Sequence, residues 1–277
     1  MKPFLKWAGG KTQLLDEINK VLPSEYSSYF EPFLGGGAVF LSLRPQKAVV
    51  SDINPQLIHT YIVIRDHFDD LCSAIDAIDN GKPCSKELYY SVRSSFNDNI
   101  YQGKYSIDMA AQLIWLNHHC FNGLYRTNKK GGFNTPWNRT EKFIPSYDRD
   151  NLRDISSYLM NNNIDIRCAS YVDVLDMPVK GDVVFLDPPY VPVGKYGDFK
   201  RYSKEQFYDN DQIELAQKVK YLNDKQVFFC LTNSNADLVH QLYSDFDIRI
   251  IKTHRNINSK GAGRVGEDAI VIPRRTN

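Results

Sequence analysis

Short apolar runs of strand length alternate with helical patterns in the first and last parts of the chain. Tyr29–Phe33, Ala48–Asp52 and Asp182–Leu186 are each bounded by turn residues and include aromatic or β-branched side chains. Such alternation is typical of an α/β fold with a mostly parallel sheet. Further strands are predicted at Ile164–Ala169, Gln226–Thr232, Ile248–Thr253 and Asp268–Ile272, and helices at Leu14–Leu22, Ala38–Leu41, Asp211–Leu222 and Asp237–Tyr243.

The alternation stops in the middle of the chain. Helical spacing of apolar residues appears in Leu57–Arg65, Phe68–Ile78 and Ile107–Phe121, and polar loops separate these segments. We therefore predict a discontinuous α/β domain of residues 1–57 and 148–277, interrupted by a mainly helical insertion at 58–147.

A carboxylate, two prolines and an aromatic residue follow the predicted strand Asp182–Leu186. Asp187, Pro188, Pro189 and Tyr190 would therefore lie at the carboxyl edge of a sheet, where open α/β folds bind ligands. An amino group suits this tetrad, because the carboxylate and a proline carbonyl accept its protons while the tyrosine stacks on its ring. A simple Asp-Pro turn is the alternative for an isolated tripeptide. The Gly- and Lys-rich segment Val191–Lys204 predicts a mobile loop beside the site.

Leu34-Gly35-Gly36-Gly37 forms a predicted strand-to-helix turn, where the absence of side chains lets the backbone approach a ligand. Asp52 ends the next strand, in the position from which an acid binds ribose hydroxyls. Taken alone, Asp52 would be a helix cap before Asn54-Pro55. The spacings of a dinucleotide fingerprint and of a phosphate loop are both missing, although Gly10-Lys11-Thr12 resembles the end of the latter.

The segment Phe121–Arg139 mixes aromatic, amide and cationic side chains. Arginine and asparagine can each bond a base edge, and an aromatic ring can insert between bases. Four cations, Lys129, Lys130, Arg139 and Lys142, could neutralise phosphates. A solvated loop with one buried aromatic is an equally good interpretation of the composition.

The composition is that of a globular protein, with 42% hydrophobic and 24% charged residues and a net charge of +1. The five cysteines form no CxxC pair, and the six histidines have no partner at ligand spacing, so we expect no disulfide and no metal. No apolar run approaches the roughly 20 residues of a membrane span, and no leader precedes the first helix. These features predict a cytoplasmic protein.

Seven motifs together resemble the Dam-type DNA adenine N6-methyltransferases of the D12 class, the GATC-recognising group, nearly from end to end. They are FLKWAGGK, FEPFLGGG, VSDINPQLI, FNGLYR, FNTPW, ASYVD and DPPY, in the order of that family. The resemblance implies a Rossmann-like sheet with one antiparallel hairpin strand. It also implies S-adenosylmethionine as cofactor, double-stranded DNA as partner and the insertion as target-recognition domain.

The resemblance also implies a role for individual residues. The catalytic set would be Asp187, Pro188, Pro189 and Tyr190. Cofactor binding would involve Trp7, Ala8, Lys11, Glu31, Phe33, Gly35, Gly37, Asp52, Ser170, Tyr171 and Asp187. DNA would be contacted by Lys6, Phe121, Asn122, Leu124, Arg126, Pro136 and Arg139, with Phe121 as wedge and Arg126 on guanine.

The expected reaction is methyl transfer to an adenine flipped out of the duplex. Related enzymes could instead methylate an amine in RNA, in a free base or in a protein glutamine. A catalytically silent DNA-binding module is the alternative from another class, although such a module would not require Asp187 or the glycine turn. A monomer is expected, because methylation acts on one strand at a time.

Overall fold

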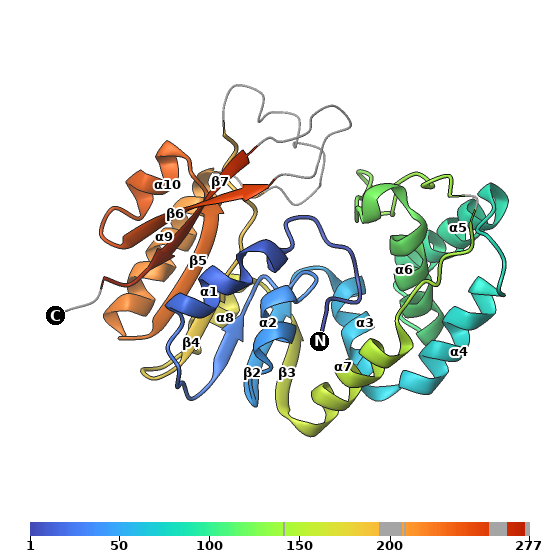
Figure 1. Cartoon of the computed structure of the whole chain (residues 1–277), viewed down its shortest axis with the longest axis horizontal. Coiled ribbons are helices and arrows are strands. Elements are labelled where there is room, and N and C mark those ends of the chain that lie inside the picture. The colour runs from blue at the N-terminus through green and yellow to red at the C-terminus, as the bar shows by residue number, and fades with distance from the viewer. Residues whose placement is uncertain (141, 194–206, 208, 255–264, 275–277) are drawn as a thin grey trace.

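The computed structural model describes residues 1–140, 142–193, 207, 209–254 and 265–274. Within them, seven strands form one sheet in the order β3-β2-β1-β4-β5-β7-β6 (Figure 1). The strands are β1 (Tyr29–Glu31), β2 (Lys47–Asp52), β3 (Asn163–Cys168), β4 (Val183–Leu186), β5 (Phe228–Ser234), β6 (Asp247–His254) and β7 (Val265–Ile272). The predicted loop at Arg255–Arg264 lies outside the described residues, as does most of the predicted loop at Val191–Lys204.

Strands β1 and β4 are parallel neighbours at the centre of the sheet. The chain continues from β1 to β2 on one side and from β4 to β5 on the other, so the strand order reverses between them. Strand β7 runs antiparallel to both β5 and β6, which confirms a mostly parallel sheet with one antiparallel hairpin strand. In such sheets, ligands bind at the carboxyl ends of the strands that flank the reversal.

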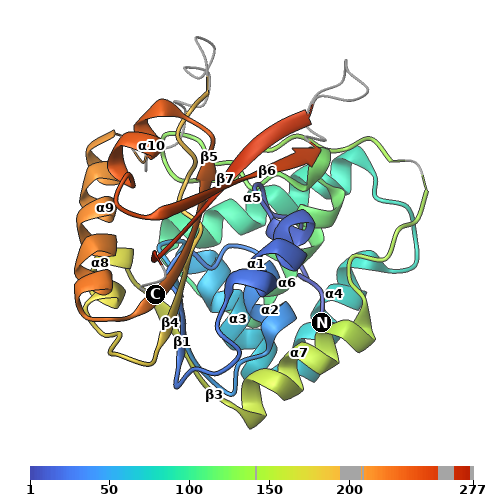
Figure 2. The same ribbon diagram turned by 60° about the vertical axis from the view of Figure 1, so that its left-hand side comes forward.

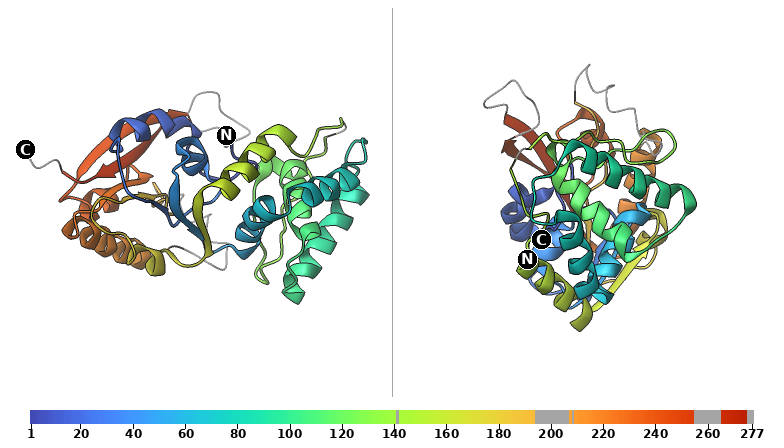
Figure 3. Two further views of the ribbon diagram at one scale, coloured as in Figure 1. Left: turned by 90° about the horizontal axis from the view of Figure 1, so that it is seen from below. Right: turned by 90° about the vertical axis from the view of Figure 1, so that its right-hand side faces the viewer.

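The two faces of the sheet are covered by different helices (Figures 2 and 3). Helices α1 (Leu15–Val21) and α2 (Ala38–Leu43) cover one face, and α8 (Tyr171–Leu175) and α9 (Asp209–Asp224) cover the other. Alternate strand residues feed two hydrophobic clusters, because successive side chains of a strand point to opposite faces. Tyr29, Val183 and Phe185 belong to the first cluster, and Phe30, Val184 and Leu186 belong to the second.

Five longer helices lie between β2 and β3: α3 (Pro55–Asp66), α4 (Phe68–Asp79), α5 (Lys86–Gln102), α6 (Ile107–His119) and α7 (Arg149–Asn161). The predictions for α3, α4 and α6 are confirmed, but α5 and α7 were not predicted. Helix α5 fully buries only Tyr89 and Phe96, so its apolar stripe is too thin to stand out. Helix α7 does bury residues at helical spacing, Leu152, Ile155 and Leu159, after an Asp148 cap, so its signal was present.

Several predicted boundaries were wrong: β7 begins at Val265 and not at Asp268, and β5 spans Phe228–Ser234 and not Gln226–Thr232. The strand predicted at Tyr29–Phe33 ends at Glu31, because the glycine turn begins earlier. The helix predicted at Ile107–Phe121 ends at His119, since Cys120 adopts an extended conformation with ψ of 163° and forms a bridge with Trp137. The short helix α10 (Asp237–Leu242) matches its prediction within a residue.

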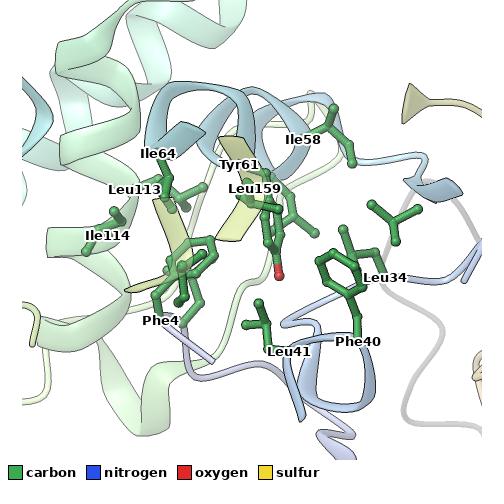
Figure 4. Packing of buried hydrophobic residues seen from close by; sticks show 14 of the residues in the cluster. Phe4, Leu34, Phe40, Leu41, Ile58, Tyr61, Ile64, Leu113, Ile114 and Leu159 are labelled. Carbon is green, nitrogen blue, oxygen red and sulfur yellow. The ribbon is translucent and has the colours of Figure 1, made fainter. Parts of the chain in front are cut away.

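The core beneath the sheet continues into the helical part of the chain. Phe4 meets the ring of Tyr61 edge to face at 4.8 Å, and both lie among Leu113, Ile114 and Leu159 (Figure 4). A buried polar cluster also ties the helices together. The Ser146 hydroxyl donates to Asp79 at 2.6 Å and bonds to His119 at 2.9 Å. None of the described helices is long and apolar enough to cross a membrane.

Candidate active site

Asp187 directly follows β4, on the central strand pair where the strand order reverses. Its Oδ1 lies 2.6 Å from Lys11 Nζ and accepts a 2.9 Å hydrogen bond from the Thr232 hydroxyl. The Lys11 side chain is 6% exposed and that of Asp187 is 20% exposed. Burial raises the pKa of Asp187 above its ordinary value, and the neighbouring Lys11 and Thr232 offset only part of this increase. A carboxylate in this setting is held in place from one side and reachable from the other.

Tyr190 lies beside the same ion pair. The Lys11 ammonium is 4.7 Å from the centre of the Tyr190 ring and also donates to the Gly9 carbonyl. The buried Pro188 and the exposed Pro189 separate the carboxylate from the ring. The structure therefore brings the N-terminal Gly9–Lys11 segment to the tetrad, a contact between residues that are far apart in the sequence.

The glycine turn after β1 is joined to the end of β2. The Gly35 N–H donates to Asp52 Oδ2 at 2.9 Å, and the Asn54 N–H donates to Asp52 Oδ1 at 2.9 Å. The helix that follows is capped by Asn54, whose side chain accepts from Leu57 N–H. The alternative in which Asp52 is merely the cap of this helix is therefore wrong.

Side chains could not be added to this turn without displacing its neighbours. Gly35 and Gly37 have φ values of +47° and +66°. A Cβ on Gly35 would lie 2.9 Å from Trp7 Cδ1, and one on Gly37 would lie 2.4 Å from the Tyr61 hydroxyl oxygen. Bare backbone next to an acid at a strand end is the surface that a nucleoside with a charged tail requires.

An aromatic cluster flanks the turn on the other face of the sheet. Phe33 stacks on Tyr171 at 5.2 Å, and Phe207 meets Phe33 edge to face at 6.0 Å. Ser170 caps α8 by accepting from Val172 N–H. Sequence reasoning missed Phe207, which precedes α9 outside any recognised motif.

Ile53 was also missed, although its position next to Asp52 was a usable signal. It is 51% exposed, which is unusual for an isoleucine that directly follows β2, a strand with neighbours on both sides. An exposed apolar side chain beside an acid and a glycine turn suits the flat face of a nucleobase.

Glu31 lies beneath the turn and not on its surface. It is buried and accepts a 2.6 Å hydrogen bond from the Tyr29 hydroxyl. Burial, helped by the negative charge of Asp187, raises the pKa of Glu31 to about 8. Trp7 is half-buried against the turn, and Ala8 is exposed beside it. Of these three residues, Trp7 is the one that packs directly against the glycines of the turn.

The cysteines do not form a nucleophilic centre. Four of the five are buried, and burial raises the pKa of Cys230 to about 12 and those of Cys84 and Cys120 to about 11. A protonated thiol is a poor nucleophile. Within the described ranges, no group of three or more His, Cys, Asp or Glu side chains could hold a metal ion.

The segment Phe121–Arg139 forms an ordered hairpin. Its arms are joined by bridges between Cys120 and Trp137 and between Thr127 and Phe133. Phe133 is buried, and its backbone exchanges two hydrogen bonds with the Asn97 side chain of α5, at 2.7 and 3.0 Å. The single buried aromatic expected of a solvated loop is present, and the bridges and the Asn97 bonds hold this loop in one conformation.

The exposed side chains of this hairpin include most of those predicted to contact DNA. Phe121 is 50% exposed and follows α6 directly. The Arg126 guanidinium is exposed, and Asn134 fixes its orientation through a 2.8 Å hydrogen bond. Asn122, Pro136 and Arg139 are also exposed, and Leu124 is half-buried. An exposed arginine in a fixed orientation is suited to bidentate recognition of a base.

Asn117 ties the N-terminal segment to the hairpin. Its amide bonds to the Lys6 N–H and carbonyl at 2.7 and 2.9 Å and donates to Gly123 O at 3.0 Å. The Trp7 ring also stacks on Tyr125 at 5.2 Å. Sequence reasoning missed Asn117, which lies inside an apolar helix, and it assigned no role to Tyr125. Trp7 thus contacts both the glycine turn and the hairpin.

A glycine turn, a strand-end acid and an Asp-Pro-Pro-Tyr tetrad on the central strands of such a sheet define an S-adenosylmethionine-dependent methyltransferase of amino groups. A family model described as D12 class N6 adenine-specific DNA methyltransferase matches residues 7–257. The chain belongs to this family. It is accordingly a DNA adenine methyltransferase whose methyl donor is S-adenosylmethionine.

Named relatives resemble the chain over almost all of its length. The Type II methyltransferase M1.LlaDCHI of Lactococcus lactis subsp. cremoris is 37% identical over 272 residues, which are 98% of this chain and 95% of the relative. The Type II methyltransferase M.MjaIII of Methanocaldococcus jannaschii is 39% identical, covering 95% of each chain. The DNA adenine methylase of Escherichia coli K12 is 30% identical over 98% of this chain and 94% of the relative.

Proposed function

We propose that this enzyme methylates N6 of an adenine flipped out of duplex DNA, within the sequence GATC, at the Asp187–Tyr190 tetrad. The observation that supports this most directly is the position of Asp187. Its carboxylate lies between Thr232 and Lys11 at the carboxyl end of β4, next to the glycine turn of the neighbouring strand. Methyl donor and amine acceptor would therefore be held on adjacent strand ends.

The residues around the glycine turn fit the cofactor. S-adenosylmethionine, when bound, supplies an electrophilic methyl group on a sulfonium. Asp52 would hold its ribose, and Ile53, Ser170 and Tyr171 would contact its adenine. Phe33, Gly35 and Gly37 would line the turn, with Trp7, Ala8, Lys11 and Glu31 at the methionine end. The two positive-φ glycines support this assignment, since side chains there would occupy the cradle.

Asp187 and the Pro188 carbonyl would each accept one N6 proton, and the Tyr190 ring would stack on the adenine. The nitrogen lone pair is delocalised into the ring, so the amine is a poor nucleophile. Two acceptors favour the pyramidal amine and stabilise the positive charge that develops on it. The cofactor would supply the methyl group to this nitrogen, and the Asp187 carboxylate would accept the excess proton that the methylated amine carries. Positioning and electrostatic stabilisation would accelerate methyl transfer, and no covalent enzyme intermediate is required.

The hairpin provides the target recognition in this proposal. Phe121 would enter the base stack beside Asn122, and Arg126 would bind a guanine, with Leu124 and Pro136 on neighbouring bases. Lys6 would reach a second guanine, and Arg139 a phosphate. The resemblance of this hairpin to the GATC-recognising group supports GATC as the site. Residues 58–147 would then be the target-recognition domain, and residues 1–57 and 148–277 the catalytic domain.

A cytoplasmic monomer is the form that we propose. The DNA substrate and the protonated thiols agree with a reducing compartment that contains DNA. One active site per duplex suffices, because each target adenine is modified separately.

The test is methyl transfer to defined duplexes. Purified protein is incubated with S-adenosylmethionine labelled in the methyl group and with a duplex that contains one GATC. A duplex of equal composition with GTAC in its place is the control. Label recovered as N6-methyladenine from the first duplex alone is the expected result. Equal labelling of both would refute GATC, and label found only in RNA or protein would refute the DNA target.

A further inference from the structure

The backbone after the two prolines is held by buried side chains and not by a strand partner. Prolines have no N–H, so this segment cannot continue the ladder of β4. Instead, Gln212 Nε2 donates to the Pro189 carbonyl at 2.8 Å, and the Val191 N–H donates to Asn233 Oδ1 at 2.9 Å. These two bonds fix the backbone on both sides of Tyr190.

The two amides also bind each other, which gives each of them one working orientation. Asn233 Nδ2 donates to Gln212 Oε1 at 3.2 Å. Because Gln212 uses its nitrogen on the Pro189 carbonyl, its oxygen must face Asn233, whose own oxygen then faces Val191. Ser234 completes the set, since its hydroxyl donates to the Val191 carbonyl.

This pair of amides is buried in otherwise apolar surroundings. Gln212 is 2% exposed and Asn233 is fully buried. The other inward residues of α9 are Leu215, Ala216, Val219 and Leu222, which pack in the same apolar cluster as β4 and β5. Packing alone would be served by leucine or methionine at position 212, whereas a buried amide is tolerated only when its bonds are made.

The hydrogen-bonded amides of Gln212 and Asn233, here called the amide relay, occupy one of the two proline carbonyls of the tetrad and leave the other for a ligand. Gln212 engages the carbonyl of Pro189, and within the described part of the chain no donor reaches that of Pro188. The Pro188 carbonyl comes directly after Asp187, so these two acceptors are the pair that would hold one amino group. Rotation of the peptide bond plane before or after Pro189 would change both the direction of the Pro188 carbonyl and the plane of the Tyr190 ring.

We propose that Gln212 and Asn233 are positioning residues for methyl transfer, which hold the Pro188 carbonyl and the Tyr190 ring toward the target amine. The proposal rests on the proposed function of the tetrad. Neither amide touches the substrate. Their effect is transmitted through the backbone of residues 189–191 and falls on the chemical step more than on the binding of cofactor or DNA.

The test compares Gln212→Glu with the matched control Gln217→Glu, an exposed position on the same helix. The introduced carboxylate at position 212 has the size of the amide but cannot donate to the Pro189 carbonyl. A displacement of about 1 Å at a reacting group lowers rates by about 100-fold. We expect a decrease of that order in the single-turnover rate for Gln212→Glu, with native Kd values for S-adenosylmethionine and duplex, and no change for the control.

Acidification separates positioning from a general loss of structure. Protonation lets the introduced carboxyl donate again, so the ratio of variant to native rate should rise as the pH falls. A native single-turnover rate in Gln212→Glu would overturn the proposal. So would a parallel loss of rate, both affinities and Tm, which indicates a merely structural role.

Ser234→Ala keeps the proposal testable if Gln212→Glu does not fold. It removes one hydroxyl and no amide, and it should lower the single-turnover rate at native affinities. An unchanged rate in this variant would count against the proposal. A native enzyme that transfers no methyl group to adenine would overturn the proposed function itself, and the positioning role with it.

Discussion

Replacement of Gly37 by alanine tests the geometry of the cofactor turn. Gly37 has a φ of +66°, and a Cβ there would lie 2.4 Å from the Tyr61 hydroxyl oxygen. The left-handed conformation costs a residue with a Cβ roughly 1–2 kcal/mol. Overpacking a buried site adds typically about 1–3 kcal/mol. Together, Gly37→Ala should destabilise the fold by about 2–5 kcal/mol.

Gly81→Ala is the matched control for the backbone term alone. Its φ is +70°, and nothing lies within 4 Å of the position that a Cβ would take. It should cost only the roughly 1–2 kcal/mol of the conformation. Thermal unfolding followed by circular dichroism can resolve the difference, since 1 kcal/mol shifts Tm by about 2–4 °C in a domain of this size.

Tyr61→Phe should rescue Gly37→Ala, because the phenol oxygen is the atom in conflict with the new Cβ. Among the residues that the structure describes, that hydroxyl makes one long hydrogen bond, of 3.5 Å, to the Gly35 carbonyl, so the single variant should be nearly neutral. The double-mutant cycle should give a coupling of about 1–3 kcal/mol. A Gly37→Ala variant no less stable than Gly81→Ala, or a coupling of zero, would refute the reasoning.

Three further variants test the site. Asp187→Ala should abolish methyl transfer while S-adenosylmethionine affinity stays within about tenfold, or 1.4 kcal/mol, as measured by equilibrium dialysis; near-native turnover would contradict its role. Arg126→Ala should lose about 1–3 kcal/mol of discrimination at one base position, whereas the control Lys129→Ala should weaken binding to all duplexes alike, with a smaller salt dependence; equal loss on every substituted duplex would exclude Arg126 from base recognition. Glu31→Gln tests the raised pKa of about 8: the folded protein keeps the Glu31 proton to higher pH than the unfolded chain, so the stability from this group is full below pH 4.5 and is lost as the pH rises to about 8. The Tm of Glu31→Gln, relative to that of the native protein, should therefore rise between pH 4.5 and about 8. A difference in Tm that stays constant over this range would contradict the raised pKa of Glu31.

The parts of the site that depend on local pattern could be predicted from the sequence. Asp52 ends one apolar strand and the Asp187–Tyr190 tetrad follows another, and parallel strands bring their carboxyl ends to one edge of a sheet. Three glycines at a strand-to-helix turn likewise indicate close backbone approach without any tertiary information. Seven ordered motifs were enough to predict the family, and its model matches residues 7–257.

Contacts between side chains that are far apart in the sequence could not be predicted in this way. Lys11 reaches Asp187 across 176 positions of sequence (187 − 11), and Asn117 holds the backbone of Lys6. Such contacts depend on the order of the strands and on how α6 packs, which local periodicity does not specify. The amide relay of Gln212 and Asn233 follows the same rule. No local pattern singles out these two residues. They meet because α9 packs against β5, next to a segment whose prolines have no N–H to donate to a neighbouring strand.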